Sequence, residues 1–346
     1  MIYADLLKDI IRIPSISGDE NGVASLIERS LKRERVCVFR SDNNIWAYNR
    51  FFDKSKKTIM LCSHIDTVPP NDGYVIDPYS PYIQDDKLFG LGSNDAGASV
   101  TAFIALFLHF FDRENLKYNL CLAIVSEEEI VGENGVTSIL PKIGNIDFAV
   151  VGEPTSMKMA VAERGLMVLD CIATGKSGHA AHDNTINPIL IAMKDIGWFS
   201  NYKFGKTSPL LGDVKMSVTI IKSGNRHNVV PSECRFTVDV RSTECYTHSE
   251  ILNIISHNVI SSVTPRSTRL NPSSIDLSHP IVCAAKDIGI DVFGSKTLSD
   301  QALIPFPSVK IGVGDSQRSH TADEYVYVSE LEDGIAKFIK LFNEIL

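Results

Sequence analysis

The sequence has 346 residues, 44% of them hydrophobic and 22% charged, with 42 acidic against 34 basic side chains and a formal net charge of −8. A chain of this length exceeds the usual size of one hydrophobic core, so it predicts a soluble globular protein with two domains. The acidic balance, with no basic stripe, argues against nucleic acid and anionic membrane surfaces as partners.

The cysteine pattern and the N-terminus indicate a cellular compartment. The seven cysteines are scattered and none forms a C-x-x-C pair, which is typical of reduced thiols in a cytoplasmic protein. The first residues, M-I-Y-A-D-L-L-K-D-I-I-R, have amphipathic spacing and predict a helix, not a signal peptide. The longest apolar run, Val100 to Phe111, is about half of what a bilayer requires and predicts a buried core helix. We therefore expect a cytoplasmic protein.

The first half of the chain alternates helix and strand patterns. Apolar residues recur at helical spacing near the N-terminus and again from Val23 to Leu31, after the turn S-I-S-G-D-E. Apolar runs of strand length follow at 36–39, 45–48, 59–62, 119–125 and 148–151. A loop rich in Pro, Asp and Gly is expected at 69–86. Strands that alternate with helices predict a mainly parallel sheet.

From about Gly165 the pattern changes to the two-residue alternation of half-buried antiparallel strands. Such strands are predicted at 168–173, 214–221 and 235–240, and helices at 188–199 and 248–260 interleave with them. We therefore predict a larger α/β domain, residues 1–164 and 276–346, interrupted by a smaller α+β domain, residues 165–275. The polar segment 263–278 is expected to be the return connection, and helices at 278–288 and 329–345 complete the larger domain.

The apolar run Ile59–Cys62 is followed by H-I-D, the pattern around which the predicted site is arranged. His64 and Asp66 lie two residues apart, so both point to one face of an extended chain. A carboxylate there can accept the second ring N–H of a metal-bound imidazole and fix its tautomer. Taken alone, the pair is explained at least as well by a structural histidine at a strand end.

Acidic or histidine side chains also follow other apolar runs or glycine turns, namely Asp95, Glu128, Glu129, Glu153 and His320. Open α/β sheets place sites at the carboxyl ends of strands, where unpaired carboxylates would repel one another. Divalent cations remove that repulsion, and a mixed His/carboxylate set suits zinc, with manganese or cobalt as substitutes. Two imidazoles and three carboxylates suffice for two metals about 3.5–4 Å apart. Singly, E-E-E is usually a solvated helix start and G-E-P a turn; their repeated placement supports the metal prediction.

Motifs along nearly the whole chain resemble, in order, those of the peptidase M20 family of metallohydrolases with two co-catalytic metals. They are S-H-I-D-T-V-P, L-G-S-N-D-A-G, S-E-E-E-I-V-G, V-V-G-E-P-T, G-H-A-A, N-V-V-P…V-D-V-R and S-H-T-A-D-E. The resemblance implies that the larger α/β domain holds the two metals. It also implies that the inserted domain is a lid through which a homodimer forms.

The resemblance implies a role for each metal-binding position. His64 and Glu153 resemble ligands of the first metal, and Glu129 and His320 resemble ligands of the second. Asp95 resembles the aspartate that bridges both metals.

Other motif residues resemble catalytic groups. Asp66 resembles the partner that orients His64, and Glu128 the general base that moves a proton from water to the leaving amine. Glu127 then stands where the family often has Asp, and the alternative is an assignment shifted by one residue along the three glutamates. His179 resembles a lid histidine that stabilises the oxyanion, in the family from the partner subunit.

The remaining lid positions have competing interpretations. His182, close to His179, is expected to be a surface histidine. Asn228 and Arg241 resemble substrate contacts, although Arg241 could instead form an ion pair with Asp239. Arg164 is either a hinge residue or a second contact for a substrate carboxylate.

The run K-T-L-S-D-Q-A-L-I-P-F-P-S-V-K-I-G-V-G-D-S-Q-R-S-H-T-A-D-E resembles a compact deacetylase branch of arginine biosynthesis. This implies zinc-dependent hydrolysis of an N-acyl-L-amino acid, namely an N-acetyl- or N-succinyl-L-ornithine or -citrulline. A succinyl group would need a further cation, for which Lys296 and Arg318 are candidates. The alternatives on the same scaffold are a succinyl-diaminopimelate desuccinylase and an exopeptidase or dipeptidase. A non-catalytic binding protein is disfavoured, because both histidines, the aspartate and the glutamate pair are retained.

Overall fold

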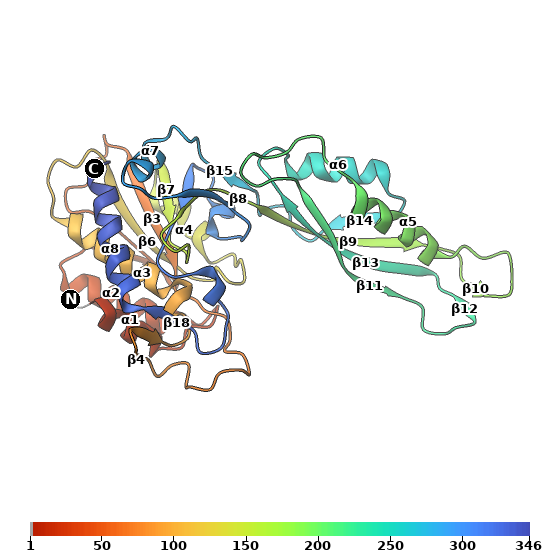
Figure 1. The fold of residues 1–346 in the computed structure, drawn as a ribbon, viewed down its shortest axis with the longest axis horizontal. Coiled ribbons are helices and arrows are strands. Elements are labelled where there is room, and N and C mark those ends of the chain that lie inside the picture. The colour runs from red at the N-terminus through yellow and green to blue at the C-terminus, as the bar shows by residue number, and fades with distance from the viewer. Residues whose placement is uncertain (1–2) are drawn as a thin grey trace. The chain divides into compact units, whose positions relative to one another are not determined.

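The computed structural model describes residues 3–346 and divides into two compact units (Figure 1). The first unit comprises Met1–Val161, Ser274–Phe293 and Ser299–Leu346, and the second comprises Ala162–Ser273 and Gly294–Leu298. The short segment 294–298 therefore belongs with the inserted unit, where Ser295 O accepts the Arg164 N–H at 3.1 Å. The hydropathy pattern did not indicate this return contact.

A nine-stranded sheet crosses the first unit in the order β1-β2-β6-β3-β7-β17-β8-β15, with β16 also paired to β8. Its strands are β1 (Val38–Ser41), β2 (Asn44–Tyr48), β3 (Thr58–His64), β6 (Asn119–Val125), β7 (Phe148–Val151), β8 (Met159–Glu163), β15 (Ser273–Ser274), β16 (Val292–Ser295) and β17 (Ser308–Lys310). The strands β6, β3, β7 and β17 pair in parallel, and β1, β2 and β8 join antiparallel. The predicted, mainly parallel sheet is confirmed.

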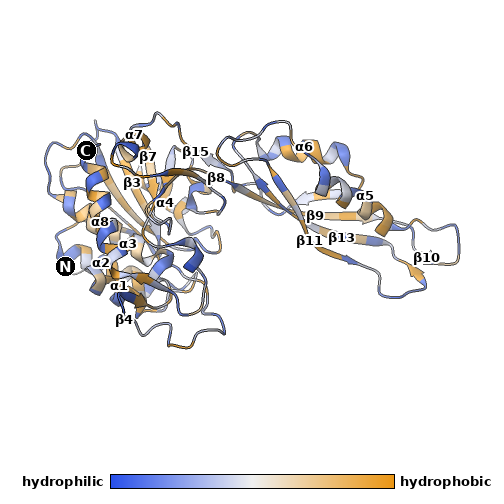
Figure 2. Ribbon diagram, viewed as in Figure 1, coloured by the Kyte–Doolittle hydropathy of each residue, from blue (hydrophilic) through white to orange (hydrophobic). Residues whose placement is uncertain are grey.

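The central strands are mostly apolar because both faces of the sheet are covered. Every residue of β3, β6 and β7 is buried, and Figure 2 shows these strands as mostly hydrophobic. The helices of this unit are α1 (Tyr3–Ile11), α2 (Asn21–Arg33), α3 (Ala98–Phe111), α4 (Val136–Ile143), α7 (Pro280–Asp287) and α8 (Val328–Asn343). Helix α4 covers one face through Val136 and Ile139, which pack in one cluster with Met60 and Cys121.

Helix α3 is the core helix that the long apolar run predicts. The Phe103 ring packs against Phe338 of α8 with centroids 5.2 Å apart. Among residues 3–346, the segment Ser93–Phe111 is the one helix long and apolar enough to cross a membrane by composition, and 83% of its most apolar window is buried. Its hydropathy is therefore that of a helix largely enclosed by the fold.

A small sheet replaces part of the loop expected at 69–86. It consists of β4 (Tyr82–Gln84), β5 (Lys87–Phe89) and β18 (Tyr325–Tyr327), in the order β18-β5-β4. These strands have three residues each, and β4 is exposed throughout, so they leave no hydrophobic period in the sequence. Their pairing holds the C-terminal loop beside the turn that follows β5.

The second unit contains an antiparallel sheet in the order β11-β13-β9-β14. Its strands are β9 (Gly165–Thr174), β11 (Lys215–Ser223), β13 (Glu233–Ser242) and β14 (Ser262–Pro265), accompanied by helices α5 (Pro188–Asn201) and α6 (His248–Asn258). Phe199 and Ile251 from the two helices pack in one cluster with Leu169 and Phe236 of the sheet. The predicted α+β arrangement is confirmed. The fourth strand, β14, lies where a return connection was expected, and its four residues are too few to show a period.

Candidate metal centre

Three parallel strands end at one edge of the large sheet and place acidic or histidine side chains there. The register pairs His64 of β3 with Val125 of β6, and Cys62 of β3 with Val151 of β7. Glu128 and Glu129 follow β6, and Glu153 follows β7. The aligned carboxyl ends therefore bring these side chains together, as the strand pattern predicts.

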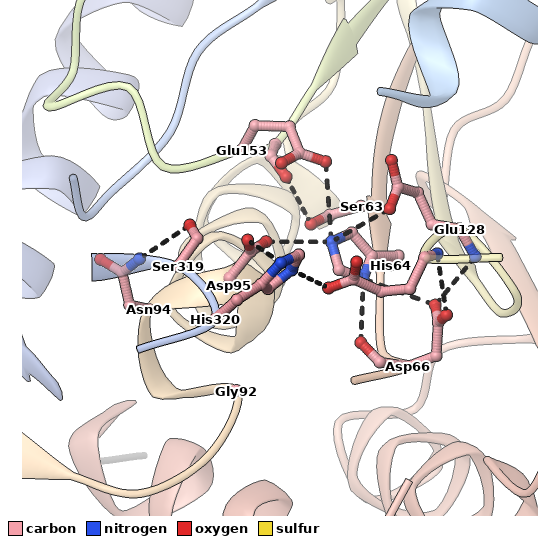
Figure 3. Close-up of polar contacts among 12 residues, drawn as sticks. Ser63, His64, Asp66, Gly92, Asn94, Asp95, Glu128, Glu153, Ser319 and His320 are labelled. Atoms are coloured by element: carbon pink, nitrogen blue, oxygen red, sulfur yellow. Dashed lines mark hydrogen bonds and ion pairs between the residues drawn. The ribbon is translucent and has the colours of Figure 1, made fainter. Parts of the chain in front are cut away.

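A first group of metal donors forms around His64 (Figure 3). The His64 Nε2 atom lies 3.3 Å from Asp95 Oδ1 and 3.6 Å from Glu153 Oε1. One donor atom from each of these three residues lies within 4.8 Å of the others. The His64 ring is buried, so the group is enclosed on the side of the protein core.

A second group shares Asp95 with the first. The His320 Nε2 atom lies 2.9 Å from Glu129 Oε1 and 3.8 Å from Asp95 Oδ2. Asp95 thus presents Oδ1 to His64 and Oδ2 to His320. One carboxylate between two donor groups is the arrangement that a pair of bridged cations requires.

The three consecutive glutamates point to different partners. Glu127 has a left-handed backbone (φ 57°), and its carboxylate accepts the backbone N–H and the side-chain amide of Asn134. Glu129 contacts His320, whereas Glu128 Oε2 lies 4.0 Å from His64 Nε2. Glu128 and Glu129 also form a third donor group with His64, but Glu128 is in neither group that contains Asp95. Glu129 therefore belongs to two donor groups and Glu128 to one, so Glu129 is the better placed of the two to hold a cation.

Asp66 contacts more than the histidine it was predicted to orient. Its buried carboxylate lies 3.4 Å from His64 Nδ1 and accepts a hydrogen bond from Ser17 Oγ at 2.7 Å. It also accepts the backbone N–H groups of Glu128 and Glu129, both at 3.0 Å. Asp66 therefore fixes the turn after β6 together with the imidazole at the end of β3.

Asp95 lies on a tight turn, Ser93–Gly97, that precedes α3, and its peptide bond to Ala96 is cis. Gly92 opens this turn with φ 75°, and a Cβ atom there would lie 2.7 Å from Thr67 Cγ2, so the position requires glycine. The backbone N–H groups of the turn bond to Glu324, a buried residue to which the sequence analysis gave no role. Its only sequence signal is its place in S-H-T-A-D-E, four residues after His320.

The electrostatics of the centre reflect carboxylates crowded in a buried space. Burial raises the pKa of Glu153 to about 8, with Asp95 acting in the same direction and His64 opposing both. Burial also raises the pKa of Glu128 well above its ordinary range. Burial alone would lower the pKa of His64, but the charge of Glu128 and the hydrogen bonds to Asp66 and Asp95 raise it well above its usual value.

These residues fit a pair of divalent cations. Glu153 Oε1 is buried and has no hydrogen-bond partner, which is costly for a carboxylate unless a positive charge faces it. His64, Asp95 and Glu153 would hold one cation, and Asp95, Glu129 and His320 would hold the other. Each set combines one imidazole nitrogen with carboxylate oxygens, a mixture that suits divalent transition metals.

The predicted lid histidine and Asn228 lie together in the second unit. The short strands β10 (Gly178–His179) and β12 (Val229–Val230) pair His179 with Val229, and Asn228 O accepts the Ala180 N–H at 3.0 Å. The exposed His179 ring accepts the Ala181 N–H on Nδ1 at 3.2 Å. The His182 ring lies 5.6 Å from it, centroid to centroid.

The other predicted substrate contacts are occupied within their own unit. Arg241 Nε and Nη2 bond to the two oxygens of Asp239 at 2.8 and 3.1 Å, which is the ion pair weighed as the alternative. The Arg164 guanidinium donates to the carbonyls of Leu211 and Asp213. In the first unit, Arg318 Nη2 donates to both carboxylate oxygens of Glu330, so this candidate for a succinyl contact is already paired.

The chain resembles known hydrolases along nearly its whole length. It is 26% identical to succinyl-diaminopimelate desuccinylase 2 of Ruegeria sp. (strain TM1040) over 274 residues, which cover 73% of this chain and 68% of that protein. It is 24% identical to succinyl-diaminopimelate desuccinylase of Cereibacter sphaeroides (strain ATCC 17025 / ATH 2.4.3) over 360 residues, covering 94% of each chain.

Solved structures share the fold at lower identity. Aminopeptidase PepT from Bacillus cereus ATCC 10987 superposes with a TM-score of 0.79 and 17% identity, covering 99% of this chain and 98% of that one. The Bacillus subtilis YXEP protein, a dinuclear metal-binding peptidase, superposes with a TM-score of 0.74 and 16% identity over 98% and 96% of the two chains. The sequence profile of Peptidase family M20/M25/M40 matches residues 60–344. The resemblance inferred from the motifs is thus confirmed, and the chain belongs to this family of metallohydrolases.

Proposed function

We propose that the protein hydrolyses the amide bond of an N-acyl-L-amino acid, with N-succinyl-diaminopimelate as the first candidate substrate. The observation that carries the proposal is the sharing of Asp95 between two groups of metal donors, with Glu128 beside them. Relatives named succinyl-diaminopimelate desuccinylases support the substrate. The N-acyl-ornithine or -citrulline substrates and the arginine pathway predicted from the C-terminal run receive no support from these names, so they become competitors in the test.

The catalytic chemistry follows from the side chains around the two donor groups. Two bound divalent cations, which we propose to be zinc with cobalt or manganese as substitutes, would supply Lewis acidity to water and to the substrate carbonyl. Glu128 lies at the edge of both groups and takes the proton that the attacking water loses. As the C–N bond breaks, Glu128 passes this proton to the leaving nitrogen, so the products are a free amine and the acyl carboxylate.

Asp66 and Ser17 prepare this geometry without touching substrate. Asp66 faces His64 Nδ1 with its backbone carbonyl at 3.0 Å and its carboxylate at 3.4 Å, which directs Nε2 toward Asp95 and Glu153. The same carboxylate anchors the backbone of Glu128, so the proposed base and the histidine ligand share one support. Ser17 Oγ satisfies Asp66 from the N-terminal segment.

His179 supplies the hydrogen bond to the oxyanion in this proposal. Because its Nδ1 accepts the Ala181 N–H, the neutral ring carries its proton on Nε2 and offers a donor. Asn228 lies beside it and is proposed as a polar contact for the substrate. Arg241 is at the opposite end of β13, roughly 26 Å along an extended strand from Glu233. A small substrate cannot contact both ends of the sheet of one copy, so Asn228 and Arg241 serve one site only if two copies contribute.

A homodimer through the second unit completes the proposal. Strand β11 is at the edge of its sheet, with Ile220 and Ile221 46% and 53% exposed. Helix α5, which packs on this strand, exposes Leu190 and Met193 by 58% and 59%. An unpaired edge beside exposed apolar side chains favours association with a second copy. We also propose a cytoplasmic location, supported by cysteines that lie as separate thiols.

A substrate panel tests the proposed reaction. Protein loaded with zinc, and separately with cobalt, is assayed on N-succinyl-diaminopimelate, on N-acetyl- and N-succinyl-ornithine and -citrulline, and on dipeptides and tripeptides. We expect the highest kcat/KM on N-succinyl-diaminopimelate and release of a free amine. A preference for the ornithine or citrulline compounds would instead favour a deacylase of arginine biosynthesis. A preference for peptides would reject an N-acyl-amino-acid substrate.

A further inference from the structure

The carboxylate of Glu324 accepts three backbone hydrogen bonds from the turn that carries Asp95. Its Oε1 accepts the N–H groups of Asn94 and Asp95 at 2.7 and 2.9 Å, and Oε2 accepts the N–H of Gly92 at 3.2 Å. The side chain is 1% exposed. Because three N–H groups of the turn bond to one buried side chain, this contact restricts the conformation of the turn.

Glu324 belongs to the same loop as His320, which is a member of the second donor group. Gly90 N–H bonds to Glu324 O at 2.9 Å, and Asn71 Nδ2 bonds to His320 O at 3.2 Å. His320 itself has a left-handed backbone (φ 59°), which a side chain adopts only when its surroundings hold it there. The position of Asp95 relative to His320 therefore depends on contacts made by one short loop.

Asp66 makes the same kind of contact with the turn that follows β6. Each buried carboxylate accepts adjacent backbone N–H groups of a turn that presents donor side chains: Glu128 and Glu129 for Asp66, Asn94 and Asp95 for Glu324. A carboxylate is suited to this task because it carries acceptors alone. A glutamine amide would direct a donor toward one of the converging N–H groups.

We propose that Glu324 is a positioning residue for the second cation site, which sets Asp95 against His320 and so determines how tightly that site binds its metal. The inference rests on the proposed two-cation centre and is independent of the substrate. Glu324 does not touch the cations or the substrate; it acts through the backbone of Gly92, Asn94 and Asp95.

The test compares Glu324→Ala and Glu324→Gln with the matched control Glu332→Gln, which changes an exposed glutamate of α8. The protein, stripped of metal, is titrated with Co²⁺ while the visible absorption spectrum and the bound metal per chain are recorded. We expect two bound cations in the wild type and the control. In Glu324→Ala the second equivalent should bind roughly 10–100-fold more weakly, with an altered spectrum, while the first changes less.

Glu324→Gln separates positioning from a general loss of structure. Its amide oxygen can still accept the N–H groups of Asn94 and Asp95, and its NH₂ group opposes the Gly92 N–H. We therefore expect a smaller loss of second-site affinity than in Glu324→Ala, with thermal unfolding of the metal-free protein close to that of the wild type. If Glu324→Ala does not fold, the second-site Co²⁺ affinity of Glu324→Gln alone tests the proposal.

Two results would overturn the assignment. One is that Glu324→Ala has the same second-site affinity and the same Co²⁺ spectrum as the wild type. Where only Glu324→Gln folds, the same result in that variant overturns the assignment. The other is equal weakening of both sites. A wild type that binds one cation would instead reject the two-cation function itself, so the two failures are distinguishable. Neither readout requires the correct substrate.

Discussion

Neighbouring carboxylates in the centre differ in what surrounds them, although all are the same kind of group. Glu127 adopts a left-handed backbone and bonds to Asn134, while Glu129 faces His320 and Glu128 faces His64. The left-handed residue redirects the chain after β6, and Asp66 then holds the next two N–H groups. Three identical side chains in sequence thereby acquire three different environments.

Replacing Glu128 by glutamine is expected to lower kcat by about 10²–10⁴-fold with the number of bound cations unchanged. The amide keeps the size of the side chain but cannot accept the proton from water. Steady-state kinetics on the preferred substrate and metal analysis of the purified variant check this expectation. The matched control is Glu127→Gln, which should keep kcat within a few-fold and lose about 1 kcal/mol of stability at Asn134.

Unimpaired kcat in Glu128→Gln would remove its role as the base. Loss of turnover in Glu127→Gln instead would show that the assignment along the three glutamates has slipped by one residue. Loss of one bound cation in Glu128→Gln would make Glu128 a ligand. The two variants together therefore distinguish a base at Glu128, a base at Glu127 and a ligand at Glu128.

At the scale of the elements, the end of β7 meets α3 so closely that only glycine fits between them. A Cβ atom on Gly152 would lie 2.7 Å from Cε2 of Phe103 and 3.0 Å from Cβ of Ser99. Gly152 directly precedes Glu153, so the close approach of strand and helix also sets the position of a proposed metal ligand. The core and the site are coupled at this residue.

Gly152→Ala is therefore expected to destabilise the protein by about 1–3 kcal/mol and to weaken binding at the first cation site. Thermal unfolding and Co²⁺ titration measure the two effects. Gly197→Ala is the matched control: it lies inside α5 with nothing within 4 Å of the added methyl group, and we expect it to stabilise by about 0.4–1 kcal/mol. Wild-type stability and metal affinity in Gly152→Ala would contradict the proposed coupling.

The sequence predicts those helices and strands whose buried residues form a regular hydrophobic pattern. Strands β3, β6 and β7 are enclosed on both faces and read as continuous apolar runs, and β9 alternates between buried and half-buried residues. The small sheet of β4, β5 and β18 is short and partly exposed, so its pairing depends on tertiary contacts.

The metal donors are foreseeable for a related reason, because parallel strands align their carboxyl ends and each donor follows an apolar run or a glycine turn. Glu324 is different, since its function lies in bonds to a backbone turn far away in the sequence. The partner of Arg241 was also undecided, because a guanidinium near Asp239 in sequence is equally compatible with an ion pair and a substrate contact. The structure shows the ion pair.

At the scale of the whole molecule, each chain carries the proposed catalytic residues in two separate units. The metal donors and Glu128 are in the first unit, and His179 and Asn228 are in the second. If a homodimer brings His179 of one copy to the donors of the other, each complete site draws on two chains. Inactivating variants in different units should then complement each other, whereas variants in the same unit should not.

Mixing Glu128→Gln with His179→Ala is expected to restore activity that neither variant has alone. Random pairing places one intact site in each heterodimer, so about a quarter of all sites should be active in an equal mixture and about half of the sites in purified heterodimers. The variants are co-expressed with different tags, heterodimers are purified through both tags, and kcat per site is compared with the wild type. The control pairs Glu128→Gln with Glu153→Ala, both in the first unit, and should remain inactive. Purified heterodimers without activity would place His179 in its own copy's site, and full activity of His179→Ala alone would place it outside catalysis. Monomers in sedimentation at micromolar concentration would reject the shared site altogether.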